Sequence, residues 1–159
     1  MAYYNTISKS YDELHGSEQL NKIKIINSSI IIGKNTKMLD VGCGTGISSQ
    51  INCDVVGIDP SIGLLKLNKN TKKIVGLVES LPFKDNAFDY VISVTSIHNF
   101  KDIRKSIAEI KRVGRNNFVF SVLRKSKKYA IISRIVEENF RIERKIVEDK
   151  DVIFFCSKR

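Results

Sequence analysis

The chain has 159 residues, 42% of them hydrophobic and 28% charged, and its formal net charge is +10. A globular chain of this length buries about 70% of its unfolded surface, so we expect one domain over residues 1–159. No apolar run reaches the roughly 20 residues that span a bilayer, which argues against membrane insertion. Cys43, Cys53 and Cys156 lack the spacing of a zinc site or a disulfide framework. We therefore expect no bound metal and a reducing, cytoplasmic location.

The positive charge is compatible with an anionic partner, because lysine and arginine attract phosphate groups. Lysines nevertheless occur along the whole chain, which is also rich in Ile and Asn. A general bias in composition therefore explains much of the excess, and charge alone leaves nucleic-acid binding open.

The hydrophobic pattern predicts strands and helices that alternate along the chain, which indicates a mainly parallel sheet. The first element is an amphipathic helix over 17–32, with Ser17 able to cap its start and Gly33 to end it. The next elements are strands at 37–41 and 53–59, a short helix from Ser61, strands at 72–78 and 87–94, a helix at 101–113, a strand at 117–123 and a helix at 127–139.

The end of the chain departs from this alternation. FRIERKIVE and DVIFFCSK read as two strands joined only by a short turn around Asp149 and Lys150. So short a connection cannot make a parallel crossover, so the two strands are expected to form an antiparallel hairpin. The predicted fold class is α/β, with a doubly wound, mainly parallel seven-stranded sheet that ends in this hairpin.

The stretch MLDVGCGTG at 38–46 places an acid at the end of an apolar strand and a glycine at every second position after it. Glycines at 42, 44 and 46 let the backbone turn tightly and approach a ligand without Cβ clashes. Ligands bind at such a strand exit where strand order reverses in an open α/β sheet. A dinucleotide would require G-x-G-x-x-G, but the third position after Gly44 is Ile47. The spacing therefore disfavours a dinucleotide.

The second strand, in VVGIDPS, ends in Asp59, where a carboxylate can accept hydrogen bonds from both hydroxyls of a ribose. S-adenosylmethionine carries such a ribose, as NAD does. At this point the sequence resembles the class I S-adenosylmethionine-dependent methyltransferases, in particular the UbiE-like (methyltransferase type 11) group. The resemblance rests on LDVGCGTG, VVGIDPS, VESLPFKDNAFDYVIS and IHNFKDIRKSIAEIKRV, in this order within residues 38–113, and on YYNTISKSYDELHG near the N-terminus. It implies a Rossmann-like methyltransferase fold, S-adenosyl-L-methionine as cofactor, and methyl transfer by in-line displacement.

The resemblance also implies a role for each matching residue. Tyr11 would belong to an N-terminal lid, residues 1–16, that closes over the cofactor. The methionine part would face Asp40 and the turn of Gly42, Cys43, Gly44 and Gly46, in which Cys43 is a small filler and not a nucleophile. Asp59 and Pro60 would lie at the ribose, Val78 and Glu79 at the adenine, and Ser93 beside the methionine and the transferred methyl group.

Two features depart from the group's pattern. Where related sequences commonly have Gly-Asp-Ala, this chain has Gly76, Leu77 and Val78, so the carboxylate that would hold the adenine amino group is missing. Adenine recognition is then expected to rest on the backbone at Val78 and on Glu79. Only ISSQIN separates the glycine turn from the second strand, which predicts a helix of about two turns where relatives have about four.

Several residues have alternative interpretations. His98 could act as a general base, yet a positioning or packing role is also open for it and for Asn99. Asp59 could cap the next helix instead of binding ribose. Asp89 is interpreted as structural, supporting the glycine loop or the strand edge, and His15 as part of the lid or the surface.

The acceptor of the methyl group is not determined by these motifs. A small molecule is one class; RNA or protein, with or without a partner subunit, is the other. The basic run RKSKK at 124–128 follows the fifth strand, where ligand sites lie in this architecture, and is either a contact for such an acceptor or a solvated loop. A non-catalytic binding module is a third alternative, which the intact set of glycines and acids disfavours.

Overall fold

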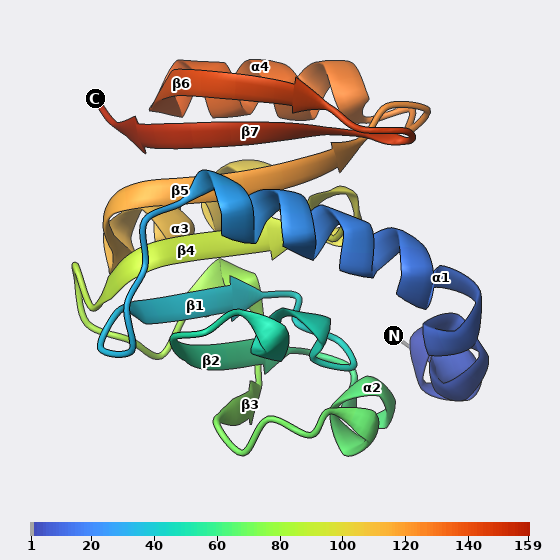
Figure 1. Cartoon of the computed structure of the whole chain (residues 1–159). Helices are drawn as coiled ribbons and strands as arrows, with labels where there is room; N and C mark the ends of the chain where they lie inside the picture. Colours follow the sequence, from blue (N-terminus) through green and yellow to red (C-terminus); the bar gives the residue numbers. More distant parts are fainter. Residues whose placement is uncertain (1) are drawn as a thin grey trace.

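The computed structural model describes the backbone of residues 2–159 and the side chains from residue 16 onward (Figure 1). Its centre is a seven-stranded sheet with the strand order β3-β2-β1-β4-β5-β7-β6. The strands are β1 Lys37–Val41, β2 Asp54–Asp59, β3 Lys73–Val75, β4 Phe88–Val94, β5 Gly114–Leu123, β6 Phe140–Val147 and β7 Asp151–Lys158. The helices are α1 Ala2–Ser29, α2 Ile62–Leu67, α3 Ile103–Val113 and α4 Tyr129–Asn139, with 3-10 turns η1 Ile47–Gln50, η2 Val78–Ser80 and η3 Ile97–Asn99.

The sheet has the predicted mixed topology. Strands β3, β2, β1, β4 and β5 pair in parallel, and β7 pairs antiparallel with both β5 and β6. On one side of β1 the chain adds β2 and then β3. On the other side it adds β4 and then β5, so strand order reverses beside β1. In the hairpin, Glu148 and Asp151 exchange backbone hydrogen bonds of 2.9 and 3.0 Å around the turn. The doubly wound sheet and its terminal hairpin are confirmed.

Helices cover both faces of the sheet, with α1 on one face and α3 and α4 on the other (Figure 1). Successive strand residues point to opposite faces, so each strand contributes to both cores. Under α1, the core contains Ile23, Ile26, Met38, Ile92, Val119 and Ile153. Under α3 and α4, it contains Leu39, Val91, Phe118, Ile107, Ile132 and Phe154.

The first helix differs from the prediction. It runs from Ala2 to Ser29 instead of over 17–32, because no proline interrupts the segment and one glycine inside a helix costs only about 1 kcal/mol. It ends early where the hydroxyls of Ser28 and Ser29 both donate to the carbonyl of Ile25, at 3.0 and 2.7 Å. The predicted lid segment therefore belongs to the same continuous helix.

Two further elements are shorter than predicted. The expected two-turn helix after the glycine turn is a single 3-10 turn, Ile47–Gln50, because the few residues before β2 must also return the chain to the neighbouring strand. The third strand pairs only over Lys73–Val75, and the next residues turn into η2. In the part of the chain that the structure describes, no helix is both long and apolar enough to cross a membrane.

Candidate functional site

The glycine turn lies at the carboxyl ends of β1 and β2, which point to the right in Figure 1. Its three glycines all have positive φ angles, 76° at Gly42, 51° at Gly44 and 84° at Gly46. The backbone N–H groups of Gly42 and Cys43 donate to the carbonyl of Ile58, at 2.8 and 3.1 Å. The turn is therefore fastened to the end of β2, next to Asp59.

Gly44 and Gly42 have different steric reasons to lack a side chain. A Cβ added to Gly44 would meet only the Leu64 side chain, at 3.7 Å, so the space beside this glycine is open. A Cβ on Gly42 would lie 2.5 Å from the hydroxyl oxygen of Ser96. Gly42 thus permits close packing against the loop after β4, whereas Gly44 leaves open space beside the turn that a ligand could enter.

Asp59 is held by the glycine turn and by the start of α2. The N–H of Gly44 donates to Oδ2 at 3.0 Å, and the N–H of Ser61 donates to Oδ1 at 2.7 Å. Burial raises the pKa of this carboxyl, and the two N–H groups oppose that shift. Ser61, not Asp59, caps α2 by accepting from the N–H of Leu64 at 3.2 Å. Each Asp59 oxygen keeps a further lone pair for a ligand hydroxyl.

Asp40 is the second buried acid of the site and is only 4% exposed. It accepts a hydrogen bond from the hydroxyl of Ser48 in η1. Burial, with a smaller contribution from the charge of Asp59, raises the pKa of Asp40 to about 7, although the Ser48 hydrogen bond opposes the rise. A cationic group beside this carboxyl would therefore relieve a costly buried charge.

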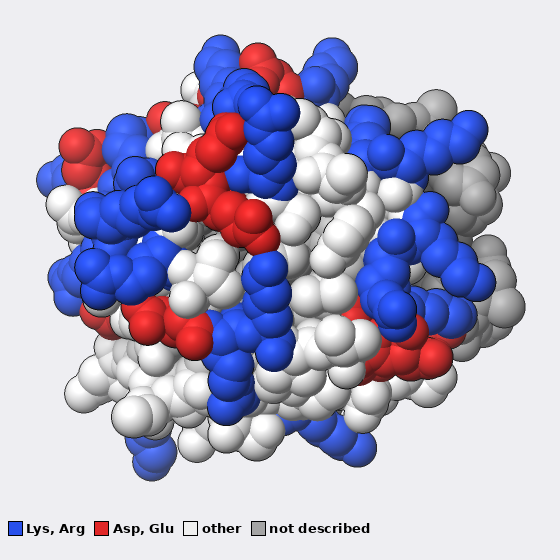
Figure 2. Space-filling model, turned by 90° about the horizontal axis from the view of Figure 1, so that it is seen from above, with Lys and Arg blue, Asp and Glu red and all other residues white. Residues whose placement is uncertain are grey.

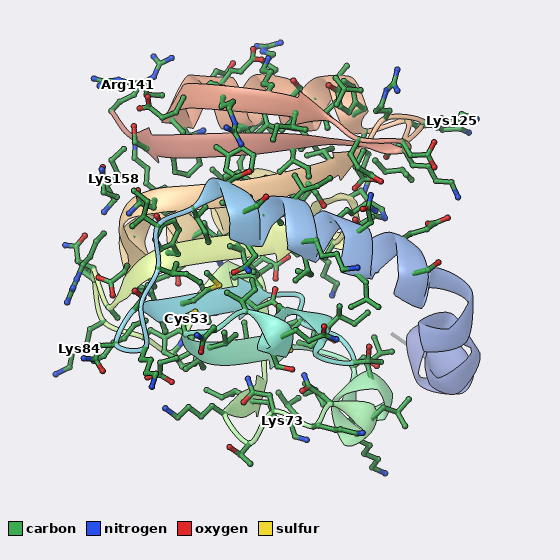
Figure 3. All side chains as sticks on the ribbon, viewed as in Figure 1. Cys53, Lys73, Lys84, Lys125, Arg141 and Lys158 are labelled. Atoms are coloured by element: carbon green, nitrogen blue, oxygen red, sulfur yellow. The ribbon has the colours of Figure 1, made fainter. Side chains whose placement is uncertain are left out.

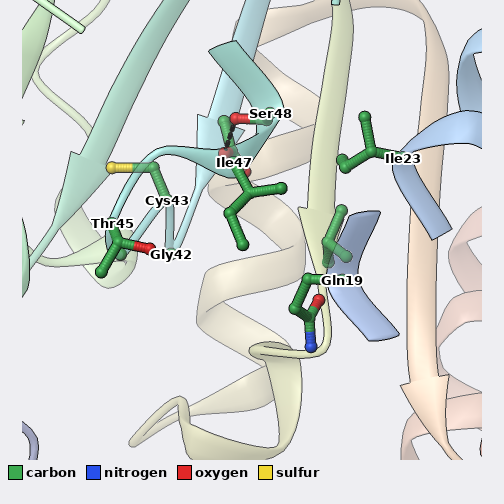
Figure 4. Close-up of a pocket in the computed structure, with 10 residues that line it drawn as sticks. Gln19, Ile23, Gly42, Cys43, Thr45, Ile47 and Ser48 are labelled. Carbon is green, nitrogen blue, oxygen red and sulfur yellow. Dashed lines mark hydrogen bonds between the residues drawn. The ribbon is translucent and has the colours of Figure 1, made fainter. Parts of the chain in front are cut away.

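Asp40 lines a hollow, the Asp40 hollow, which lies between the glycine turn and α1 (Figure 4). Gln19 and Ile23 enter it from α1, and Thr45 and Ile47 from the glycine turn and η1. In Figure 4 the sulfur of Cys43 points away from Gln19 and Ile23. Helix α1 thus forms one wall of the hollow.

Two more hollows continue along the carboxyl ends of the strands. The Asp59 hollow is lined by Asp59, Pro60, Leu64 and the loop after β4, from Val94 to Ser96. The Glu79 hollow is lined mainly by apolar side chains, together with Glu79. All three hollows share Gly42. The three hollows together offer the buried acid Asp40 at one end, Asp59 in the middle and an apolar surface at the other end. The apolar surface consists of Val41, Ile58, Pro60, Leu77, Val78 and Phe100.

Most of the sequence-predicted residues are brought together here, with different surroundings. Pro60 borders the Asp59 and Glu79 hollows, and Val78 borders the latter. Glu79 already accepts from the N–H groups of Lys101 and Asp102, at 2.9 and 3.3 Å. It therefore also fixes the segment that leads into α3.

Ser93 lies differently from what its predicted role requires. Its side chain is 0% exposed and its hydroxyl is 2.7 Å from that of Ser96. The next residue, Val94, is the one that lines the Asp40 and Asp59 hollows. A one-residue shift along a strand moves a side chain to the other face, which explains the difference.

His98 lies in η3, beyond the loop after β4. Of the described side chains that line the three hollows, none is that of His98. Its Nδ1 is buried and has no hydrogen-bond partner among the described residues. Burial lowers the pKa of His98, Asp151 opposes the shift, and Lys128 and Lys22 add to it.

Other predicted residues lie elsewhere. Asp89 supports the strand edge at the opposite end of the sheet, where it accepts from the N–H of Lys37 at 2.9 Å and pairs with Arg115 at 2.7 Å. The side chains of Tyr11 and His15 are outside the described residues. Where side chains are described, no group of three or more His, Cys, Asp or Glu residues could hold a metal ion.

Asn68, which the sequence analysis missed, supports the glycine turn from beneath. Its side chain is 3% exposed, and its Nδ2 donates to the carbonyl of Gly44 at 3.1 Å. A Cβ on Gly46 would lie 2.1 Å from Oδ1 of Asn68, so Gly46 provides the space for this amide. An asparagine after a short helix gives no sequence signal for such a contact.

The basic run 124–128 lies between β5 and α4, at the carboxyl ends of the parallel strands, where Figure 3 labels Lys125. Arg124, Lys125 and Lys127 are exposed, and Lys128 donates to the carbonyl of His98 at 3.0 Å. On the face seen in Figure 2, acidic side chains lie among the lysines and arginines.

Comparison with known proteins gives a consistent family. A family model described as "Methyltransferase domain" matches residues 39–121. The chain is 36% identical over 148 residues to the uncharacterized protein MJ1252 of Methanocaldococcus jannaschii, which covers 87% of this chain and 57% of that protein. It is 33% identical over 128 residues to demethylmenaquinone methyltransferase of Staphylococcus aureus, covering 69% of this chain and 53% of that protein. The chain thus spans a little over half the length of these relatives.

Solved structures share the fold. A SAM-dependent methyltransferase from Aquifex aeolicus superposes with a TM-score of 0.78 at 17% identity, covering 98% of both chains. At this identity the similarity concerns the fold alone.

Proposed function

Because the chain belongs to the methyltransferase-domain family of class I S-adenosylmethionine-dependent methyltransferases, with S-adenosylmethionine as cofactor, we propose that it transfers a methyl group from this cofactor to an acceptor molecule. The observation that supports this most directly is the pair of buried acids, Asp40 and Asp59, which line two hollows that both include Gly44. The shared hollows provide a continuous surface past both acids.

The residues present fit the cofactor. Asp40 would hold the ammonium of the methionine part, because a buried carboxyl with a raised pKa gains most from a nearby cation. Asp59 would accept from the ribose hydroxyls, since both of its oxygens are already oriented by N–H groups. The adenine ring would lie on the apolar surface that includes Val78 and Phe100, with Glu79 at its edge.

The cofactor supplies a methyl group on a positively charged sulfur, which makes a good leaving group. The protein then has to align the acceptor and exclude water, and alignment alone can contribute a large part of the rate. Gln19 and Ile23 of α1 would exclude water from one side of the site. The proposed lid, residues 1–16 with Tyr11, would extend this cover.

For the acceptor, we favour a small molecule over RNA or protein. The Staphylococcus aureus relative is named demethylmenaquinone methyltransferase, after an acceptor that is neither RNA nor protein. Lys128 already donates to the carbonyl of His98, and on the face seen in Figure 2 acidic side chains lie among the lysines and arginines. An RNA- or protein-directed enzyme with a partner subunit remains the alternative, and a non-catalytic module is disfavoured by the two buried acids.

We keep His98 as the proposed general base, although it lies in η3 and lines none of the three hollows in the unliganded chain. Burial lowers the pKa of its imidazole, which favours the neutral form that a general base requires. We further propose that the chain is a single domain. We also propose that it works in the cytoplasm, because the thiols of Cys43, Cys53 and Cys156 are free.

A transfer assay tests the proposed function. The protein is incubated with tritium-labelled S-adenosylmethionine and fractionated cell extract, before and after ribonuclease treatment. We expect labelled product in a small-molecule fraction, unaffected by ribonuclease, and none with Gly44→Val, whose side chain would fill the open space beside the turn. Equal labelling by the wild type and Gly44→Val would contradict the proposal, and label lost after ribonuclease would favour the RNA alternative.

A further inference from the structure

A buried ion pair lies outside the three hollows, at the same end of the sheet. Lys22 of α1 and Asp151 of β7 are 2% and 0% exposed, and their Nζ and Oδ1 atoms are 3.2 Å apart. Removing two charges from water offsets most of their attraction, so apolar residues of similar size often stabilise a protein equally well. Stability alone therefore does not account for the pair.

The pair is connected to Thr95, the first residue after β4. Lys22 donates to Oγ1 of Thr95 at 3.0 Å, and this hydroxyl donates to Oδ2 of Asp151 at 2.8 Å. The N–H of Thr95 donates to the hydroxyl of Ser121 in β5, at 2.8 Å. The network thus joins α1, β5 and β7 to one residue of the loop after β4.

Thr95 has a conformation that a β-branched residue rarely adopts. Its φ angle is 49°, in the left-handed region that favours glycine. Such strain persists only where the surroundings hold it, and it gathers at functional sites. Thr95 also lines the Asp59 hollow, between Val94 and Ser96. The network therefore fixes a residue of the site wall.

The same helix that carries Lys22 also forms the wall of the Asp40 hollow, through Gln19 and Ile23. On its exposed side, Asn21 donates to Glu148 at 3.3 Å and Glu18 pairs with Lys150. These contacts fasten α1 to the turn between β6 and β7. The position of the helix wall and the conformation of the loop after β4 are thus linked through Lys22.

We propose that Lys22 and Asp151 are positioning residues for methyl transfer, which hold Thr95 in its left-handed conformation and thereby fix the loop 94–99 against the cofactor hollows. The effect on methyl transfer rests on the proposed function. The arrangement of the loop itself is a property of the unliganded chain and can be measured separately.

The test removes both charges together in Lys22→Met/Asp151→Asn, so that no unpaired charge is left buried. Two quantities are measured: amide hydrogen exchange in residues 95–99, and the affinity for S-adenosylhomocysteine by calorimetry. We expect exchange about tenfold faster and affinity about tenfold weaker, a change worth about 1.4 kcal/mol. The control is Lys150→Met, which removes the exposed pair between the same helix and turn without touching Thr95, and should change neither quantity.

Two further variants keep the inference falsifiable. Thr95→Val preserves side-chain shape but lacks the hydroxyl, so it should reproduce both losses even if the double variant does not fold. Adding Thr95→Gly to the double variant should restore affinity to within about threefold of the wild type, because glycine adopts positive φ without help. Unchanged exchange in folded Thr95→Val or in the folded double variant would overturn the inference. A wild type that fails to bind S-adenosylhomocysteine would instead overturn the proposed function. The hydrogen-exchange result would still decide whether Lys22 and Asp151 hold the loop.

Discussion

At the scale of single residues, Asp40 and Asp59 are expected to recognise different parts of one ligand. They lie in neighbouring hollows and share the glycine turn between them. Because the acids are separate, ligands that carry only one of the two recognised groups can distinguish their contributions.

Asp59→Ala should weaken S-adenosylhomocysteine and 5′-methylthioadenosine alike, since both ligands carry the ribose. A hydrogen bond to a charged group contributes about 1.5–3 kcal/mol, so the loss should be at least about tenfold. Asp40→Asn should weaken only S-adenosylhomocysteine, because 5′-methylthioadenosine has no amino acid part. Calorimetry with both ligands checks this pattern, and an Asp59→Ala protein that binds both as tightly as the wild type would rule out the ribose assignment.

The raised pKa of Asp40 predicts that ligand binding releases a proton. The pKa rises from 3.8 to about 7 in the folded, unliganded protein, and an ammonium group would stabilise the ionised form. Affinity for S-adenosylhomocysteine should therefore increase with pH up to about 7 and then level off. Calorimetry at pH 6.5 in buffers of different ionisation enthalpy should detect the released proton, and Asp40→Asn should abolish it.

The same shift has a defined consequence for stability. Between pH 3.8 and about 7 the folded state binds more protons at Asp40 than the unfolded state, so the free energy of unfolding falls as pH rises through this window. The stabilisation from the neutral carboxyl is complete below pH 3.8 and lost above about 7. Thermal unfolding of Asp40→Asn should depend less on pH there, and an unchanged dependence would mean that Asp40 does not hold the proton.

At the scale of elements, the glycine turn depends on a residue outside it. Asn68→Ala should loosen the turn, because it removes the donor to the Gly44 carbonyl and leaves a space beside Gly46. We expect the free energy of unfolding to fall by about 1–3 kcal/mol, and S-adenosylhomocysteine to bind more weakly. Asn70→Ala, a partly buried neighbour that bonds the carbonyl of Val55, is the matched control. Equal affinity in the two variants would show that the turn does not need Asn68.

The elements that the sequence predicted are those with local signals. The strand before Gly42, the Ser61 cap and the final hairpin all depend on residues close together in the chain, and they are confirmed. The predicted start of the first helix at Ser17 was wrong, since α1 begins at Ala2, because the cap signal of Ser17 is only a preference that helix continuation overrides.

The candidate site was predicted only where its residues follow strand ends. Asp40 and Asp59 were found in this way, because parallel strands bring their carboxyl ends to one edge. Other residues of the site act through contacts between segments that are distant in sequence, so no spacing pattern predicts them. These are Lys22, Asn68 and Thr95.

At the scale of the whole molecule, the basic run 124–128 tests which class of acceptor the protein uses. Replacing Arg124, Lys125 and Lys127 by Gln should leave S-adenosylhomocysteine affinity unchanged, because these three exposed residues lie outside the three hollows, and Lys128, which donates to the carbonyl of His98, is left in place. If the acceptor is a small molecule, binding of a test RNA and its salt dependence should also be unchanged. A salt slope reduced by about 0.7 for each lost phosphate contact would instead support a single-stranded RNA acceptor.

Calorimetric titration with S-adenosylhomocysteine shows whether the open space at Gly44 is the cofactor site. The wild type should bind one molecule per chain. Gly44→Val should not bind, because its side chain would enter the open space next to Leu64 and a β-branched residue would be strained at the φ angle of 51°. Gly33→Val, where nothing lies within 4 Å of an added Cβ, should bind like the wild type. Circular dichroism is recorded for both variants to check that they are folded. Binding by folded Gly44→Val as tight as that of the wild type would contradict the account.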